Sequence, residues 1–259
     1  LPKLLRNAGY HTCHIGKTHL ASGAEAGTEQ GRRRFDEIGF DEDFATTGKN
    51  GAGVGLGDGW YVRYLREKDL SERLKADYEQ RIAERATWLG DCHSSVLDVE
   101  DYHDQWVSRT ACRWLQQVPV DRPWYLSVNW LGPHAMRDAP GRYATMYAPQ
   151  SVDPPIRDEM AKAPAEVRER QQKTLDRLRP DDWRHIRASY YGMVSLMDDG
   201  IGTMLETLEQ RGMLDDTLIV YIADHGEMLC DHGCVYKTMM YEQAAAIPLI
   251  FRWPGAFRE

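Results

Sequence analysis

The chain of 259 residues lacks any run of 18 apolar residues, so the sequence predicts no membrane-spanning helix. It has only five cysteines, and this odd number argues against a disulfide framework. The cellular compartment stays open, whether periplasmic, secreted or cytoplasmic. A formal net charge of -8 argues against a nucleic-acid-binding surface. Nothing in the composition fixes an oligomeric state.

Common catalytic signatures are also absent. The sequence has no Gly-x-Ser-x-Gly elbow and no His-Glu-x-x-His pair, which removes two frequent classes of hydrolase. The chain begins without a Met or a signal-peptide pattern and stops just after a strand-like run, so we expect a fragment cut at both ends.

Regular hydrophobic patterns are present along the chain. We expect helices over residues 2–8, 100–118 and 181–211, a charged surface helix over 70–90, and strands over 10–15, 124–130, 217–222 and 247–253. Glycine, threonine and charged residues predict loops over 20–60, and prolines predict an irregular excursion over 135–165. This order is typical of an α/β fold, a mostly parallel sheet with helices on both faces.

Polar residues gather where three predicted strands end. They are Lys17 and His19, then His134, then Asp224 and His225, with Lys237 in the loop beyond. Because the carboxyl ends of parallel strands share one edge of a sheet, these side chains can converge. Lysine and histidine suit an anion with several oxygens, and aspartate and histidine can ligate a cation. Such a set would stabilise the charge of sulfuryl or phosphoryl transfer.

Two simpler interpretations of these residues stay open. Each side chain on its own could be an ordinary surface or turn residue, with Asp224 capping the turn that follows it. A zinc site is the other alternative, since four zinc-type ligands lie within ten residues, although their spacing fits no common zinc motif. These four are His225, Cys230, His232 and Cys234.

Three segments together resemble the type I sulfatase family, within the alkaline-phosphatase-like superfamily. Residues 16–20, GKTHL, are similar to the family's Gly-Lys-Trp-His-Leu, with Thr18 in place of Trp. Residues 132–134, GPH, resemble its Pro-His loop, with Met136 where the family often has Pro. Residues 214–250 are the closest match, with Cys230 in place of the usual Gly.

The resemblance implies a role for each of the polar residues at the strand ends. Asp224 and His225 would ligate a divalent cation, usually Ca²⁺, with Mg²⁺ and Mn²⁺ as alternatives. Lys17 and Lys237 would bind sulfate oxygens. His19 would lie beside the nucleophile, and His134 would contact the sulfate and protonate the leaving oxygen.

The family's nucleophile is a formylglycine made within a Cys/Ser-x-Pro/Ala-x-Arg motif, and none of the five cysteines here has that context. We expect the motif and the first two metal carboxylates upstream of Leu1. The resemblance therefore implies a partial catalytic domain over residues 1–259, with irregular insertions at about 40–90 and 135–180, that is inactive by itself.

The expected function of the parent is hydrolysis of small-molecule or carbohydrate sulfate esters. Two alternatives remain, a phosphodiester or phosphonate monoester hydrolase and a non-catalytic relative that binds an anion or a metal.

Overall fold

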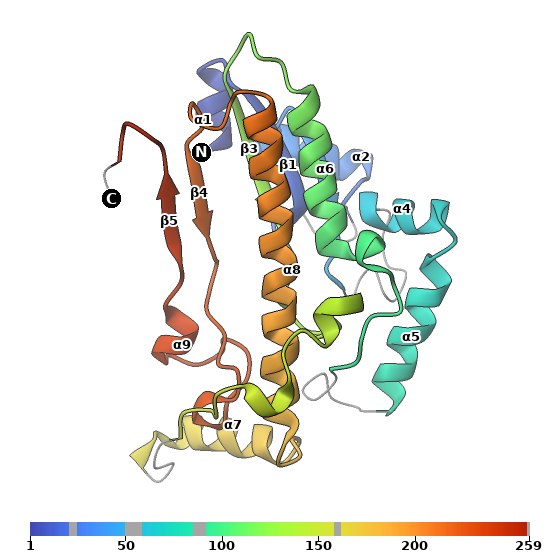
Figure 1. Cartoon of the computed structure of the whole chain (residues 1–259), viewed down its shortest axis with the longest axis vertical. Coiled ribbons are helices and arrows are strands. Elements are labelled where there is room, and N and C mark those ends of the chain that lie inside the picture. Colours follow the sequence, from blue (N-terminus) through green and yellow to red (C-terminus); the bar gives the residue numbers. More distant parts are fainter. Residues whose placement is uncertain (21–24, 50–58, 85–91, 158–161, 258–259) are drawn as a thin grey trace.

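A three-stranded parallel sheet lies at the centre of the upper part of the molecule (Figure 1). The computed structural model describes residues 1–20, 25–49, 59–84, 92–157 and 162–257. The strand order is β2 (Glu42–Thr46), β1 (His11–Lys17), β3 (Trp124–Asn129), and β1 is parallel to both neighbours. The strands predicted over 10–15 and 124–130 are confirmed, as is a parallel arrangement of these strands.

Helices cover both faces of this sheet. On one face α6 (His103–Gln117) packs on the sheet and α8 (Asp182–Gln210) packs on α6, as Figure 1 shows. The other face carries α1 (Pro2–Asn7), which contacts β1, and α2 (Glu29–Ile38), which contacts β2. None of the helices in the described residues is long and apolar enough to cross a membrane.

Alternation along β1 divides the core into two layers. Cys13 and Ile15 are fully buried and join the large cluster with Val107 and Leu115 of α6. Side chains on the other face of the strand point toward Phe35 of α2 and its neighbours. Successive residues of a strand face opposite sides, and helices cover both sides of β1, so its polar residues Thr12 and His14 are buried as well.

The prediction of loops over 20–60 is wrong in the part that the structure describes. That segment contains α2 and β2 as well as a glycine-terminated turn at Gly39, whose φ is 109°. The α2 sequence, EQGRRRFDEI, has only Gly31 and Phe35 buried. So few apolar residues give no helical period, and burial of Phe35 against the sheet stabilises the helix instead.

The two regions expected to be irregular also contain helices. Between residues 40 and 90 lie α4 (Trp60–Glu67) and α5 (Ser71–Glu84), and between 135 and 180 lies α7 (Ala165–Leu175). The helix predicted over 70–90 exists, but it buries Leu74 and Tyr78. Residues 50–58 and 85–91 of the first region lie outside the described residues.

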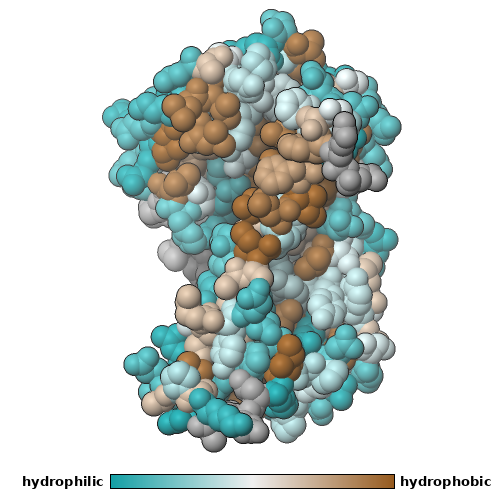
Figure 2. Space-filling view, turned by 90° about the vertical axis from the view of Figure 1, so that its left-hand side faces the viewer, coloured by the Kyte–Doolittle hydropathy of each residue, from teal (hydrophilic) through white to brown (hydrophobic). Residues whose placement is uncertain are grey.

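The last two strands form a sheet of their own. The strands β4 (Ile219–Ile222) and β5 (Leu249–Arg252) pair antiparallel, and in the described residues neither is hydrogen-bonded to the parallel sheet. The connection through α9 (Glu242–Ala245) reverses the chain, which is why the pair is antiparallel. Apolar side chains on this pair are exposed, and Figure 2, which faces this side, shows hydrophobic surface among polar residues.

A buried histidine in β1 gives the fold a pH dependence. His14 is 1% exposed and stacks on Phe35 with 4.9 Å between ring centroids. Burial lowers the pKa of His14 from 6.5 to about 4. Between these values the unfolded chain binds more protons than the folded chain, so the free energy of unfolding falls as the pH falls.

We expect this histidine alone to remove about 3 kcal/mol between pH 6.5 and 4. Urea unfolding at pH 7 and at pH 4.5 measures the loss, and His14→Phe, which keeps an aromatic ring there, should make it smaller. Equal losses in the variant and the wild type would show that the pKa of His14 is the same in the folded and unfolded states.

Candidate active site

The first two site residues leave the end of the central strand. Lys17 is the last residue of β1, and its Nζ is 2.6 Å from Nε2 of His19. Lys17 is half-buried and His19 is exposed. Burial lowers the pKa of the Lys17 ammonium, and the charge of Asp224 opposes this while that of Lys237 adds to it. The end of β1 therefore lies close to two residues that are more than 200 positions away.

His134 lies in the loop that follows β3. The backbone N–H groups of Leu131 and Gly132 both donate to Oδ1 of Asp104 at 2.9 Å, which fixes the start of the loop on α6. The loop is close-packed there, since a Cβ at Gly132 would lie 2.5 Å from Oδ2 of Asp104. His134 Nδ1 is 2.6 Å from the carbonyl oxygen of Ala135. This contact places the Nδ1 proton on that carbonyl and leaves Nε2 for other partners.

Positive charge surrounds His134. Burial lowers the pKa of this histidine; the bond to the Ala135 carbonyl opposes that, and the charges of Lys237, Lys49 and Lys17 lower it further. The imidazole is therefore neutral near pH 7. Three lysines thus act on one histidine, and Lys49 among them is already paired with Asp138.

Asp224 and His225 follow β4. His225 donates from Nδ1 to the carbonyl of Gly226 at 2.7 Å, and its Nε2 lies 3.6 Å from Oδ2 of Asp224. Gly226 is required for this turn, because a Cβ there would lie 2.0 Å from the carbonyl oxygen of Gln243. The Asp224 carboxylate is 83% exposed. One carboxylate oxygen and one imidazole nitrogen thus face the same space.

The structure brings all six predicted residues into one region. Asp224 and Lys237 are close enough to act on the pKa of Lys17, and Lys17 and Lys237 are close enough to act on the pKa of His134. His19 contacts Lys17 and His225 lies beside Asp224, so both histidines belong to the same group of side chains. The segments come from β1, the loop after β3 and the loops after β4. Their catalytic and ligand roles stay predictions.

The described residues contain no group of three or more histidine, cysteine or acidic side chains that could hold a metal ion. Asp224 and His225 have the chemistry of cation ligands, and they supply two of them. The zinc alternative gains no support, because its four residues form no such group and burial raises the pKa of Cys230 to about 12.

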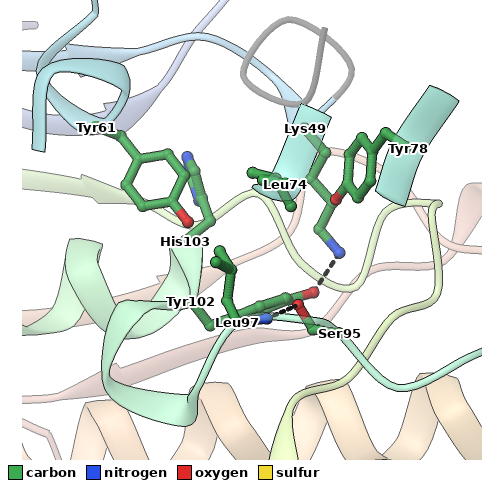
Figure 3. Close-up of a pocket in the computed structure, with 8 residues that line it drawn as sticks. All are labelled: Lys49, Tyr61, Leu74, Tyr78, Ser95, Leu97, Tyr102 and His103. Carbon is green, nitrogen blue, oxygen red and sulfur yellow. Dashed lines mark hydrogen bonds between the residues drawn. The ribbon is translucent and has the colours of Figure 1, made fainter. Parts of the chain in front are cut away.

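A buried charged network holds the segment after His134, and no sequence pattern predicted it. Lys49 donates from Nζ to Oδ1 of Asp138 at 2.7 Å and to the carbonyl of Met136 at 2.8 Å. Tyr78 and Tyr102 donate to the same carboxylate, each at 2.8 Å. Figure 3 shows Lys49 and both tyrosines around a small cavity. Lys49 thus holds the loop and adds charge near His134.

These features define a class of protein. A parallel α/β sheet brings lysine and histidine side chains together beyond the ends of β1 and β3, next to the Asp224–His225 pair. A family model described as Sulfatase matches residues 1–259. The chain belongs to the sulfatase family.

Curated relatives agree with this assignment. The chain is 26% identical to an arylsulfatase of Clostridium perfringens, over 96% of the chain and 50% of that protein. It is 27% identical to an N-acetylglucosamine-6-O-sulfatase of Bacteroides thetaiotaomicron, over 99% of the chain and 49% of that protein. The chain thus spans about half the length of these curated relatives.

Among solved structures, a phosphonate monoester hydrolase of Agrobacterium radiobacter matches with a TM-score of 0.70. The two are 21% identical over 97% of this chain and 52% of the other, so the match shows a shared fold.

Proposed function

We propose that this chain forms part of the catalytic domain of an enzyme that hydrolyses sulfate esters, with residues 1–259 in one domain. The observation that carries the proposal is the meeting of Lys17, His134 and Lys237 beside Asp224 and His225, in a chain that matches the sulfatase family along its whole length. The names of the relatives support a small-molecule or carbohydrate sulfate ester as substrate.

Each of these residues then has a task that follows from its position. Lys17 and Lys237 bind the sulfate oxygens and stabilise the charge that develops on them in the transition state. His134 holds its Nδ1 proton on the Ala135 carbonyl, so Nε2 is the nitrogen that can carry a proton to the leaving oxygen. His19, in contact with Lys17, lies where it can assist breakdown of a covalent intermediate.

Binding of the sulfate ester favours the protonated form of His134. Burial lowers the pKa of this histidine and the lysine charges lower it further, so the free site holds a neutral imidazole, which is a poor acid. A bound anion compensates the lysine charges and raises the pKa again. The proton needed for the leaving oxygen is therefore favoured only when the substrate is present.

Asp224 and His225 would hold a divalent cation, for which we propose Ca²⁺, with Mg²⁺ or Mn²⁺ as alternatives. Such an ion would draw negative charge from the sulfate oxygens as a Lewis acid. Carboxylate oxygen is a ligand that these hard cations prefer. The formylglycine nucleophile of the family would come from residues outside this chain.

Turnover by the gene product that carries these 259 residues tests the proposal. We expect hydrolysis of an aryl sulfate with a kcat/KM that exceeds that for an aryl phosphonate monoester or a phosphodiester. The phosphonate is compared because a solved structure with this fold is named a phosphonate monoester hydrolase, and the phosphodiester because it is the other anionic ester considered for this site. A preference for either of them would replace the sulfatase assignment, and no turnover of any would favour a binding protein.

A further inference from the structure

Arg137 is a buried arginine close to the candidate site. It follows His134 by three residues, and its side chain is only 1% exposed. Nη2 is 3.6 Å from Oε1 of Glu227, and the guanidinium lies 5.6 Å from the centre of the Tyr236 ring. Nε and Nη1 have no hydrogen-bond partner. A buried guanidinium is costly unless it is paired, so its contact with Glu227 is what makes this position tolerable.

Glu227 has a second set of contacts, which close a loop. Its Oε1 accepts hydrogen bonds from the backbone N–H of Tyr236 at 2.5 Å and of Leu229 at 3.4 Å. The N–H of Met228 donates to the Tyr236 carbonyl at 3.0 Å. The segment 227–236 is therefore held closed from both ends. It begins two residues after His225.

One ion pair thus joins the segments that carry the site. Arg137 belongs to the His134 loop, Glu227 follows the Asp224–His225 turn, and the loop that Glu227 closes ends one residue before Lys237. Ser189 of α8 donates to the Arg137 carbonyl at 2.9 Å, which fixes this end of the pair on the long helix.

Three titratable groups near the Arg137–Glu227 pair carry no charge near pH 7. Tyr190 and Tyr236 lie near the pair, and burial is the main reason that the pKa of each phenol is raised, to about 12 for Tyr190. Burial also raises the pKa of the Cys230 thiol nearby. All three groups are neutral near pH 7, so they do not compensate the charge of Arg137 or of Glu227.

We propose that the Arg137–Glu227 pair is a positioning clamp that sets the spacing between His134, the Asp224–His225 turn and Lys237. The inference rests on the proposed function, in which these groups act on one sulfate ester. Groups that bind and protonate one substrate must be held at fixed distances from one another, because a displacement of about 1 Å can lower the rate about 100-fold. Arg137 and Glu227 are positioning residues, since neither contacts the substrate.

Kinetics of the gene product that carries this chain test the clamp. We expect Arg137→Met to lower kcat for an aryl sulfate about 100-fold, with a smaller change in KM. Glu227→Gln keeps an oxygen acceptor for the Tyr236 N–H and removes the charge, and we expect a similar loss. The double variant should be no slower than either single variant, because both break one interaction. Arg137→Lys should recover part of the activity.

Stability separates positioning from support of the fold. Either single variant leaves one buried charge unpaired, whereas the double variant leaves none. We therefore expect the double variant to regain thermal stability without regaining kcat. A double variant that regains both would show that the pair only stabilises the fold, and additive losses in kcat would show that the two residues act separately.

Arg187 offers a matched control in the same part of the molecule. It is a buried arginine of α8 whose Nη2 donates to Oδ1 of Asp231, inside the same segment 227–236. This pair does not include the His134 loop. Arg187→Met should lower thermal stability and leave kcat within about threefold. If Arg187→Met lowers kcat as far as Arg137→Met does, general loosening of the segment explains both and the clamp is wrong.

Crystal structures of the wild type and Arg137→Met test the spacing without any turnover. We expect the separation between the His134 ring and the Lys237 Nζ to change by about 1 Å. An unchanged separation overturns the clamp even if the wild type is an active sulfatase. A changed separation in a protein without sulfatase turnover leaves the clamp intact and removes the proposed function.

Discussion

Lys17→Met in the gene product that carries this chain is expected to lower kcat/KM for an aryl sulfate by about 10²–10³-fold. Removing one preorganised donor from a charged transition state typically costs this much. Lys17 is the last residue of β1, and it shares its surroundings with Asp224 and Lys237. The charge is lost, but the methionine keeps most of the aliphatic stem, so β1 should keep its place in the sheet.

Lys3→Met is the matched control, because Lys3 lies exposed on α1. It removes the same charge from the same half of the molecule, and we expect kcat/KM to stay within about twofold of the wild type. Comparable losses in both variants would point to net charge as the cause. A wild-type rate in Lys17→Met would remove this lysine from the anion site.

Lys49→Met should lower the free energy of unfolding by about 3–5 kcal/mol, the usual cost of removing one partner from a buried ion pair. Asp138 is fully buried, and in the described residues Lys49 is the cation that forms an ion pair with it. Without that ammonium, the carboxylate keeps the two tyrosine hydroxyls and either stays charged in a low dielectric or takes up a proton. Urea unfolding at pH 7 measures the loss.

Two further variants define what the Lys49 result means. Arg33→Met breaks an exposed pair with Glu29, one turn apart on α2, and should cost less than about 0.5 kcal/mol. The double variant Lys49→Met, Asp138→Asn removes both buried charges and should be more stable than Lys49→Met alone. A double variant that is less stable would assign the effect to packing of the lysine stem.

Much of the fold is predictable from the sequence, and particular elements show why. The helix over 182–210 has a long apolar stripe and the strand at 124–129 has a dense apolar run, and both contribute to the large core. The elements α2 and β2 gave no such pattern, since each buries only two residues. Their structure depends on contacts with β1 that no local window of sequence contains.

Part of the candidate site was likewise predictable from the sequence, and part was not. Lys17, His134 and Asp224 were predicted because each follows a strand, and parallel strands end at one edge of a sheet. Lys49, Arg137 and Glu227 were not assigned roles, although Glu227 stands two residues after His225. Charged residues usually lie on the surface, and nothing local marks the few that are buried. Only packing across the fold pairs them.

The sequence by itself indicated the sulfatase family, the helices α1, α5, α6 and α8, the strands β1, β3, β4 and β5, and six polar residues at or after strand ends. The tertiary structure decided which charges are buried in pairs, how the His134 loop is held from behind, and that the last two strands pair antiparallel. The physical reason is the separation along the chain over which each kind of interaction acts. Periodicity and turn chemistry act over a few residues, whereas an ion pair such as Lys49 with Asp138 joins positions 89 residues apart.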